Sequence, residues 1–350
     1  MVLAVNGDSS AFPPVGGSVV PPESPIVPRS APSTDAQHGT SQFSKDARMT
    51  PPSVDALNAE FAIPEQVFFV EGPGGLILAE VANRHAAAAV SLLGGHVMAF
   101  QPRDEKPVLW MSEESRFEVG EPIRGGIPIC WPWFGAHPTD STQPNHGFAR
   151  RMLWRVLGTD ACDSGESLLR LGLDADAGTR SFWSHKFQLE VEIVLGRQLG
   201  VSLLTRNTGN DSFTVTAALH SYFNVSDIRN VAVRGLEDCV YIDTVGERTR
   251  RTQRGPITFT GETDRIYLDT TAPCLIEDPG LKRCIRVAKC GSHSTVVWNP
   301  WIAKSARMPD FGDSEWPGML CVETTNAAED AREIEPGGQH ALTAILSVEG

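Results

Sequence analysis

Most of the chain after residue 60 alternates hydrophobic and polar positions with the two-residue period of β-strands. In the segment Phe187-Gln-Leu-Glu-Val-Glu-Ile-Val the apolar side chains fall on every second position, which is typical of a strand with one buried face. Runs of strand length lie between turn signals at 75–81, 87–100, 168–173, 187–195, 201–206, 213–219, 285–288, 295–299 and 341–348. Long amphipathic helical patterns are absent, so the sequence predicts an all-β fold, a large antiparallel sandwich or barrel.

One turn signal is strong enough to predict a local connection. The cluster Asn207-Thr-Gly-Asn-Asp211 separates the runs 201–206 and 213–219. Asn, Gly and Asp are favoured in turns because they tolerate left-handed backbone or hydrogen-bond to it. The cluster therefore indicates a turn, and we expect the two flanking strands to form a hairpin.

Residues 1–60 differ in composition from the rest of the chain. They hold nine of the 25 prolines and nine serines, with almost no apolar periodicity. Such a segment cannot bury enough apolar surface to offset the entropy lost on ordering, so we expect a disordered Pro/Ser-rich tail. A transit peptide is a weaker alternative, because the segment is not rich in arginine. Residues 61–350 are expected to form a single large domain.

Charge and cysteine content exclude several classes of partner. Thirty Lys and Arg residues against 43 Asp and Glu give a formal net charge of −13, which argues against binding to nucleic acid or to anionic lipid. No apolar run approaches the roughly 18 residues of a membrane helix, so no membrane contact is expected. Seven cysteines without a C-x-x-C pair favour free thiols in a reducing compartment. We expect a cytoplasmic monomer.

The segment 121–135 is the first candidate for a functional loop. Its prolines at 122, 128 and 132 disfavour a helix or a central strand, and Arg124 precedes two glycines that allow close backbone approach. Trp131, Trp133 and Phe134 could wall a pocket. The alternative is a hydrophobic loop capping the sandwich, with Arg124 in a structural ion pair.

A second candidate, 145–151, concentrates polar and basic groups. Asn145, His146, Arg150 and Arg151 surround a glycine, in a chain that is acidic overall. Arginine forks suit a phosphate or carboxylate, to which they donate two parallel charge-assisted bonds. Surface pairing with nearby acids is the alternative.

Two titratable residues end apolar strands. His220 follows the run 213–219, and a histidine of near-neutral pKa suits general acid or base chemistry, although a hydrogen-bonded core histidine is the commoner case. Glu323 closes the apolar run 319–322, where a buried carboxylate costs several kcal/mol unless it is paired. Pairing with a structural arginine would explain Glu323 equally. Asp264 is either an acceptor for substrate hydroxyls or the partner of Arg265.

Most of these residues lie within six motifs that occur in order along the chain. Together the motifs resemble the glucose-6-phosphate 1-epimerase (hexose-6-phosphate mutarotase) branch of the aldose 1-epimerase family, and the resemblance covers about residues 64–349. The resemblance implies a galactose-mutarotase-like β-supersandwich, and it does not extend to residues 1–60. The motifs are Ile123-Arg-Gly-Gly-Ile-Pro with Trp131-Pro-Trp-Phe-Gly135, His146-Gly-Phe-Ala-Arg150, Leu219-His-Ser-Tyr-Phe223, Thr263-Asp-Arg-Ile-Tyr267, Val297-Trp-Asn-Pro300 and Cys321-Val-Glu-Thr-Thr325.

The resemblance also assigns roles. It implies that His220 is the general acid and Glu323 the general base in the interconversion of α and β anomers of hexose 6-phosphates. The resemblance also implies a set of residues that bind the small-molecule substrate: Arg124, Asn145, His146, Arg150 and Asp264. In this set the arginines recognise the phosphate, Asp264 binds the sugar hydroxyls, and His146 acts near C1 and the ring oxygen. The branch often has glutamine or a small residue where this chain has Asn145, which weakens that assignment.

Anomer exchange needs one acid and one base, and we expect no cofactor and no metal. The sequence has no GxxxxGK motif and no His/Cys spacing typical of a metal site. Three other functions stay open: a mutarotase for unphosphorylated aldoses, a glycan hydrolase or lyase, and a non-catalytic sugar-phosphate sensor. The arginines disfavour the first, and a His/Glu pairing in place of two carboxylates disfavours the second.

Overall fold

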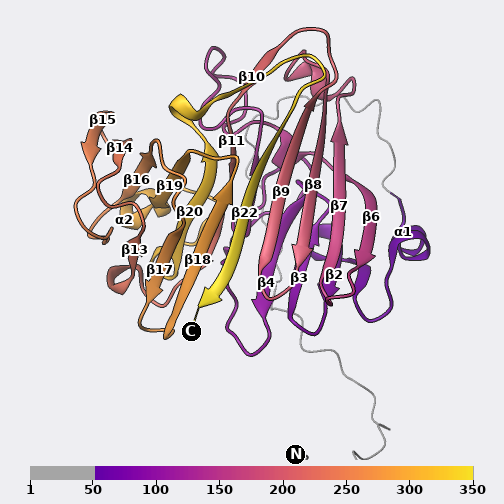
Figure 1. Cartoon of the computed structure of the whole chain (residues 1–350), viewed down its shortest axis with the longest axis horizontal. Coiled ribbons are helices and arrows are strands. Elements are labelled where there is room, and N and C mark those ends of the chain that lie inside the picture. The colour runs from indigo at the N-terminus through magenta and orange to yellow at the C-terminus, as the bar shows by residue number, and fades with distance from the viewer. Residues whose placement is uncertain (1–51, 350) are drawn as a thin grey trace, which may run out of the picture.

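The structure, a computed structural model, describes residues 52–349 and consists mainly of two eight-stranded antiparallel sheets (Figure 1). The sheet nearer the viewer in Figure 1 is called the front sheet here. Its strands, in spatial order, are β13 (Ala232–Arg234), β17 (Cys274–Asp278), β18 (Arg283–Cys290), β22 (Gln339–Glu349), β9 (Leu199–Asn207), β8 (Phe187–Leu195), β7 (Ser167–Asp174) and β6 (Arg155–Ala161).

The second eight-stranded sheet, called the rear sheet, lies behind β18 and β22 in Figure 1. A four-stranded sheet lies behind the other half of the front sheet, and a two-stranded ribbon, β10 (Phe213–Val215) with β21 (Arg332–Ile334), joins the layers. The rear sheet runs β15 (Thr249–Thr252), β14 (Val240–Asp243), β16 (Thr263–Tyr267), β19 (Ser294–Asn299), β20 (Met319–Asn326), β11 (Ala217–Leu219) and β5 (Ile129–Cys130), with β12 (Tyr222–Asn224) also on β20. The four-stranded sheet runs β1 (Val67–Glu71), β2 (Ile77–Ala82), β3 (Ala86–Ser91) and β4 (His96–Pro102).

The alternating pattern of the sequence is confirmed in the front sheet. Along β8 and β9 every second side chain is buried, and the strands pair as an antiparallel hairpin closed between Gly196 and Gln198. Their buried faces join one apolar cluster whose members range from Leu57 to Leu346. The predicted all-β antiparallel fold is therefore confirmed, because the period-2 faces have this shared core to bury.

Strand β20 is buried on both faces, which explains its continuous apolar run. Leu320 and Val322 belong to the main core, whereas Met319 and Cys321 pack into a second apolar cluster on the opposite face of the rear sheet. All eight residues of β20 are buried, so Glu323 lies within the strand and does not close it as expected. After Glu323 the strand continues with buried Thr and Asn side chains. Because these side chains are polar, the hydrophobic pattern did not identify them as part of the strand.

The expected disordered tail is partly wrong. Residues 1–51 lie outside the described part of the chain, but Val54–Phe61 form helix α1, capped by the hydroxyl of Ser53 accepting from the Ala56 N–H at 3.2 Å. Leu57 is 3% exposed and packs into the main core, and α1 lies beside β1 and β6 (Figure 1). The ordered chain thus begins before residue 61.

The hairpin expected across 207–211 is also wrong. The turn exists, but β9 pairs with β8 and β22, while β10 pairs with β21. The Asn207 side chain explains the departure, because its amide donates to the carbonyls of Asp211 at 2.9 Å and Ile334 at 2.8 Å. It thereby directs the chain away from β9 and towards the two-stranded ribbon.

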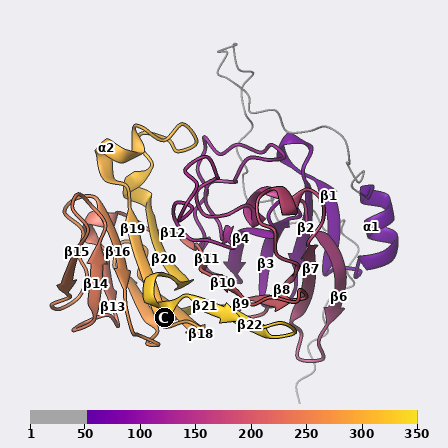
Figure 2. The same cartoon turned by 90° about the horizontal axis from the view of Figure 1, so that it is seen from above.

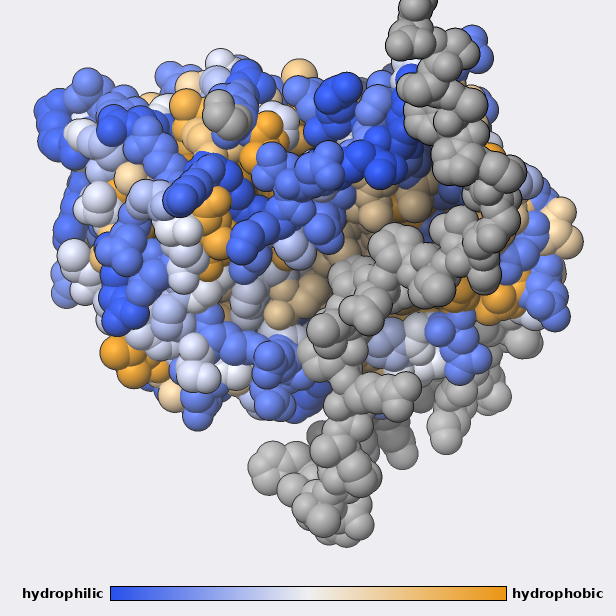
Figure 3. All heavy atoms as spheres, turned by 90° about the horizontal axis from the view of Figure 1, so that it is seen from below, coloured by the Kyte–Doolittle hydropathy of each residue, from blue (hydrophilic) through white to orange (hydrophobic). Residues whose placement is uncertain are grey.

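The surface seen in Figure 3 is largely hydrophilic, and the cysteines are free thiols. Seen from below, hydrophilic residues cover much of the visible surface and hydrophobic ones lie in small separate groups (Figure 3). All seven cysteines are free thiols; Cys130, Cys274 and Cys321 are buried, whereas Cys162 and Cys290 are exposed. Among residues 52–349, no helix has the length and apolar character needed to cross a membrane. The monomeric state and cytoplasmic location stay predictions.

Replacing Asn207 with Ala should destabilise the fold by about 2 kcal/mol, because the buried Ile334 carbonyl loses its donor. Urea unfolding followed by tryptophan fluorescence measures the change. Asn210→Ala is the matched control, since Asn210 is exposed in the same turn and should change the free energy of unfolding by less than about 0.5 kcal/mol. Equal effects at the two positions would contradict the role assigned to Asn207.

Candidate active site

The face of the rear sheet that points away from the front sheet gathers the predicted site residues. Directly opposed residues of antiparallel strands share a face, and the register places Asp264, Trp298, Cys321 and Tyr222 in one row. Glu323 lies two residues beyond Cys321 on β20 and therefore shares that face. Figure 2 shows helix α2 (Trp301–Ser305) and the purple loop segments on the same side of this sheet.

His220 and Glu323 meet at the centre of this face. The chain leaves β11 at His220, whose backbone N–H donates to the Pro128 carbonyl at 3.0 Å before β12 begins. The imidazole stacks on the Tyr222 ring at 4.8 Å and 11°, and its Nε2 lies 3.4 Å from Glu323 Oε1. The side chains are 9% and 1% exposed, so the two predicted catalytic groups form a buried pair.

Burial controls the ionisation of this pair. It raises the pKa of Glu323 well above its usual value, an effect that Asp264 reinforces and Arg150 opposes. Burial also lowers the pKa of His220 well below its usual value, and Arg150 and Arg124 lower it further. Each shift disfavours the charged form, so a neutral carboxylic acid lies beside a neutral imidazole. Transfer of the carboxyl proton to the imidazole converts this neutral pair into an ion pair.

Three buried polar atoms at the centre have no hydrogen-bond partner among residues 52–349. They are His220 Nδ1, Glu323 Oε2 and Arg150 Nε. A buried polar group without a partner costs about 1–3 kcal/mol, and native structures keep few of them. Their convergence indicates that the site is built to hydrogen-bond a polar ligand.

The two predicted arginines differ in how many of their N–H donors are already hydrogen-bonded. Arg150 lies in a single helical turn, Ala149–Arg151, and its Nη2 donates to the Asn145 carbonyl at 2.8 Å. Arg124 instead donates from Nε and Nη2 to Asp310 at 3.2 and 2.9 Å, and from Nη1 to the Tyr222 hydroxyl at 2.9 Å. The structural ion pair considered as an alternative for Arg124 therefore exists, with Asp310. Within residues 52–349, Arg150 makes fewer side-chain hydrogen bonds than Arg124.

His146 reaches the site from a strained backbone. Its φ of 63° is left-handed, and Gly147 follows in the same region, where a Cβ would lie 1.9 Å from the Trp131 carbonyl oxygen. His146 Nδ1 accepts from the Gly135 N–H at 3.3 Å, which leaves the proton of the neutral ring on Nε2. Its ring lies 5.7 Å from that of His220. Burial, reinforced by Arg150, lowers the pKa of His146 well below its usual value.

The glycines after Arg124 act as predicted. A Cβ on Gly126 would lie 2.2 Å from the Val97 carbonyl oxygen, so this loop passes against β4 without space for a side chain. His96, which sequence reasoning missed, lies within hydrogen-bond distance of the Gly125 carbonyl, Nε2 to O 2.9 Å. Burial lowers the pKa of His96 to about 3, so it stays neutral and supports the loop that carries Arg124.

Several predicted residues lie outside the central contact. Asn145 is exposed, and its backbone carbonyl accepts the hydrogen bond from Arg150. Arg151 donates to the Gly120 carbonyl and pairs with Glu121 at 3.5 Å. Trp131 is fully buried in the main core with Trp133, so the expectation that the tryptophans wall a pocket is wrong. Phe134 does approach the site, with its ring 4.9 Å from that of His146.

Asp264 faces the site and does not pair with Arg265. Neighbouring residues of a strand point to opposite faces, and Arg265 accordingly reaches Gln253 and the Tyr241 ring. Asp264 Oδ2 lies 3.5 Å from Lys304 Nζ on α2. Lys304 was missed because the recognised motif ends at Asn-Pro300, before the helix that returns the chain over the sheet.

Three potential metal ligands also come together. The ligand atoms of His220, Cys321 and Glu323 lie within 4.8 Å of one another, a set that sequence spacing did not reveal. Burial raises the pKa of the Cys321 thiol well above its usual value, and Glu323 likewise holds its proton. A cation would have to displace both protons close to Arg150, so the set is poorly suited to a metal.

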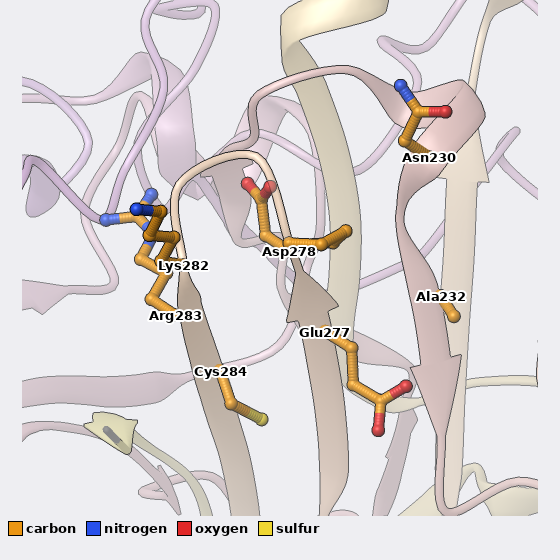
Figure 4. Close-up of a pocket in the computed structure, with 8 residues that line it drawn as sticks. Asn230, Ala232, Glu277, Asp278, Lys282, Arg283 and Cys284 are labelled. Carbon is orange, nitrogen blue, oxygen red and sulfur yellow. The ribbon is translucent and has the colours of Figure 1, made fainter.

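A surface pocket of the front sheet lies apart from this site. Figure 4 shows it between β13, β17 and β18 of the front sheet, and none of the predicted site residues lines it. Its buried acid, Asp278, already accepts from the backbone N–H groups of Ser226 and Gly280, and Arg283 donates to the Pro107 carbonyl at 3.0 Å. These groups stabilise loops and leave little for a ligand.

Comparison with known proteins places this geometry in a family. The family model described as aldose 1-epimerase matches residues 78–347. The chain belongs to the aldose 1-epimerase family. It is therefore an epimerase that acts on carbohydrates, and its substrate is a small-molecule sugar.

Particular relatives share sequence or fold with the chain. A Salmonella typhimurium protein provisionally named glucose-6-phosphate 1-epimerase is 37% identical over 264 residues, which cover 75% of this chain and 87% of that protein. The crystal structure of a provisionally assigned mutarotase from Salmonella typhimurium superposes with a TM-score of 0.77 at 33% identity, covering 82% and 95% of the two chains. A galactose mutarotase-like protein of Clostridium acetobutylicum, 15% identical with a TM-score of 0.63 over 82% and 99%, shares the fold.

Glu323→Gln should not lower the melting temperature at pH 7. The folded-state pKa of Glu323 is raised, so its ionisation favours the unfolded chain, and this penalty grows as pH rises above the ordinary glutamate value. Gln removes the ionisable group and keeps the shape. Thermal unfolding measured by circular dichroism at pH 7 and pH 4 tests this, with any advantage of Gln expected to shrink at pH 4.

Glu315→Gln provides the contrasting variant. Glu315 accepts from the Ser112 hydroxyl at 2.6 Å and from two backbone N–H groups, of Glu113 at 2.7 Å and Gly312 at 2.9 Å. An amide NH₂ would face one of these donors, so this variant should melt at a lower temperature. A clear loss of stability in Glu323→Gln at pH 7 would contradict the neutral buried carboxyl.

Proposed function

We propose that the protein is a hexose-6-phosphate mutarotase, which interconverts the α and β anomers of sugars such as glucose 6-phosphate. The observation that carries the proposal is the buried pair of His220 and Glu323, 3.4 Å apart, together with buried polar atoms of both residues and of Arg150 that have no hydrogen-bond partner within residues 52–349. Such a pair supplies an acid and a base to one anomeric centre, and Arg150 supplies donors for an anion. The name of the Salmonella typhimurium relative, glucose-6-phosphate 1-epimerase, points to the same substrate.

The chemistry requires two proton transfers and no change in oxidation state. Protonated His220 gives its proton to the ring oxygen while Glu323 takes the proton of the C1 hydroxyl, and the C1–ring oxygen bond breaks to give an aldehyde and a hydroxyl. Rotation about the C1–C2 bond presents the other carbonyl face. The hydroxyl then attacks, the protons return in reverse, and the opposite anomer forms. Because each proton returns to the group that released it, ring closure leaves protonated His220 and ionised Glu323 as at the start.

A bound phosphate would act on the protonation of both catalytic groups. Arg150 and Arg124 lower the pKa of His220, and Arg150 also lowers that of Glu323. A phosphate bound by Arg150 offsets the field of this arginine and so raises the pKa of both groups. Protonated His220, the form in which the histidine acts as acid, is thereby favoured by the substrate that Arg150 binds.

One observation favours a mutarotase for unphosphorylated aldoses as the second candidate. Asp310 accepts hydrogen bonds from two nitrogens of Arg124, so the carboxylate offsets the charge of this arginine and weakens its attraction for a phosphate. The phosphate would then depend mainly on Arg150. Kinetics on phosphorylated and free sugars separate the two functions.

Anomer exchange of glucose 6-phosphate, measured by magnetisation-transfer NMR, tests the proposed function. The wild-type protein should accelerate exchange, and Glu323→Gln should lose about 10²–10⁴-fold because the base is removed. His220→Asn should lose a similar factor. Glu277→Gln, a surface change on β17, controls for handling and should behave as wild type. Binding of glucose 6-phosphate without exchange would support a sensor and overturn the enzymatic proposal.

The arginines make separable predictions. Arg150→Ala should raise KM for glucose 6-phosphate about 10- to 100-fold, since it removes charge-assisted bonds worth about 1.5–3 kcal/mol. KM for free glucose should change little. The double variant Arg124→Ala with Asp310→Asn removes a matched pair without changing net charge, and should raise KM for glucose 6-phosphate less. Equal effects of Arg150→Ala on both sugars would contradict phosphate recognition.

A further inference from the structure

Lys304 stands at the solvent-facing edge of the site. The chain leaves β19 at Asn299, and α2 returns over the face of the rear sheet that carries the catalytic pair (Figure 2). Lys304 Nζ lies 5.7 Å from the centre of the Trp298 ring, and Trp298 in turn lies 6.1 Å from the His220 ring. The lysine charge also contributes to the lowered pKa of His146. Lys304 is therefore electrostatically part of the site.

Two carboxylates share this lysine. Its Nζ lies 3.2 Å from Glu262 Oε1 and 3.5 Å from Asp264 Oδ2, and the three side chains are 33%, 27% and 29% exposed. The catalytic pair behind them is almost fully buried. A ligand that enters the site from this side therefore meets a lysine flanked by two acids.

The charges around the site balance only with Lys304. Arg124, Arg150 and Lys304 oppose Asp310, Glu262 and Asp264, while burial disfavours the charged forms of both His220 and Glu323. Without Lys304 the acids would outnumber the bases in a chain whose net charge is −13. The carboxylate of Asp264, which is placed to accept hydrogen bonds from sugar hydroxyl groups, would then repel a dianionic ligand.

We propose that Lys304 is a specificity-determining residue, which offsets part of the negative charge of Glu262 and Asp264 so that the site admits a phosphorylated sugar. The inference rests on the proposed function and adds to it a residue outside the six recognised motifs. A purely structural tie between α2 and β16 would instead affect both sugars equally.

Lys304→Gln tests the inference through KM on two substrates. Because the residue is partly exposed and screened by solvent, its loss should raise KM for glucose 6-phosphate by about tenfold and leave KM for free glucose within about twofold. Lys304→Arg keeps the charge and should retain the wild-type ratio of the two KM values. Added salt should reduce the penalty of Lys304→Gln on glucose 6-phosphate.

Glu262→Gln in the Lys304→Gln background is the decisive variant. If Lys304 acts by neutralising the acids, removal of one acid should recover most of the lost KM for glucose 6-phosphate. Lys282→Gln removes one lysine charge from the β17–β18 turn of the front sheet (Figure 4) and controls for net charge. It should leave both KM values unchanged.

The outcomes separate the inference from the proposed function. An active wild-type enzyme whose ratio of KM values is unaltered by Lys304→Gln overturns the inference alone. A raised KM that Glu262→Gln fails to recover also overturns it, because the lysine then acts by some route other than neutralisation. A wild-type protein without anomer exchange on either sugar overturns the proposed function, and with it the inference that rests on it.

Discussion

The burial of an ionisable pair inside a fully buried strand is the constraint on which the site depends. One face of β20 packs into the main core, and the other carries Glu323 among apolar side chains. Removing a carboxylate from water is costly unless it is neutral or paired, and here burial raises the pKa of Glu323, which keeps it protonated 3.4 Å from His220. The sheet architecture supplies this environment, because strands on both sides of β20 exclude water and fix the register of the pair.

The surrounding charges are organised around that neutral centre. Asp310 pairs with Arg124, Glu262 and Asp264 pair with Lys304, and Arg150 Nε has no hydrogen-bond partner in the described part of the chain. Each cation acts on the histidines or carboxylates through a medium of low polarity, where charges interact more strongly than in water. The arrangement permits recognition of an anionic sugar by an acidic protein, since a local balance of charge matters at this range more than the net value of −13.

Some local predictions from sequence were wrong for identifiable reasons. The 207–211 turn was found, but its hairpin was not, because a buried Asn207 side chain bonds the Ile334 carbonyl far along the chain. Helix α1 was missed since its eight residues follow a proline-rich segment and its stability comes from packing Leu57 into the core. Lys304 was missed because its significance depends on α2 folding back over β16 and β19.

Strand periodicity and short motifs are local properties, so the all-β class, the family and the candidate acid, base and basic residues could be predicted from the amino-acid sequence. Which of these residues meet depends on the tertiary structure. It placed His220 against Glu323 from positions about a hundred residues apart, paired Arg124 with Asp310, and left Arg150 with unpartnered donors among residues 52–349. Those contacts join distant strands and loops, so burial, pKa and charge balance arise only when the sheets are assembled.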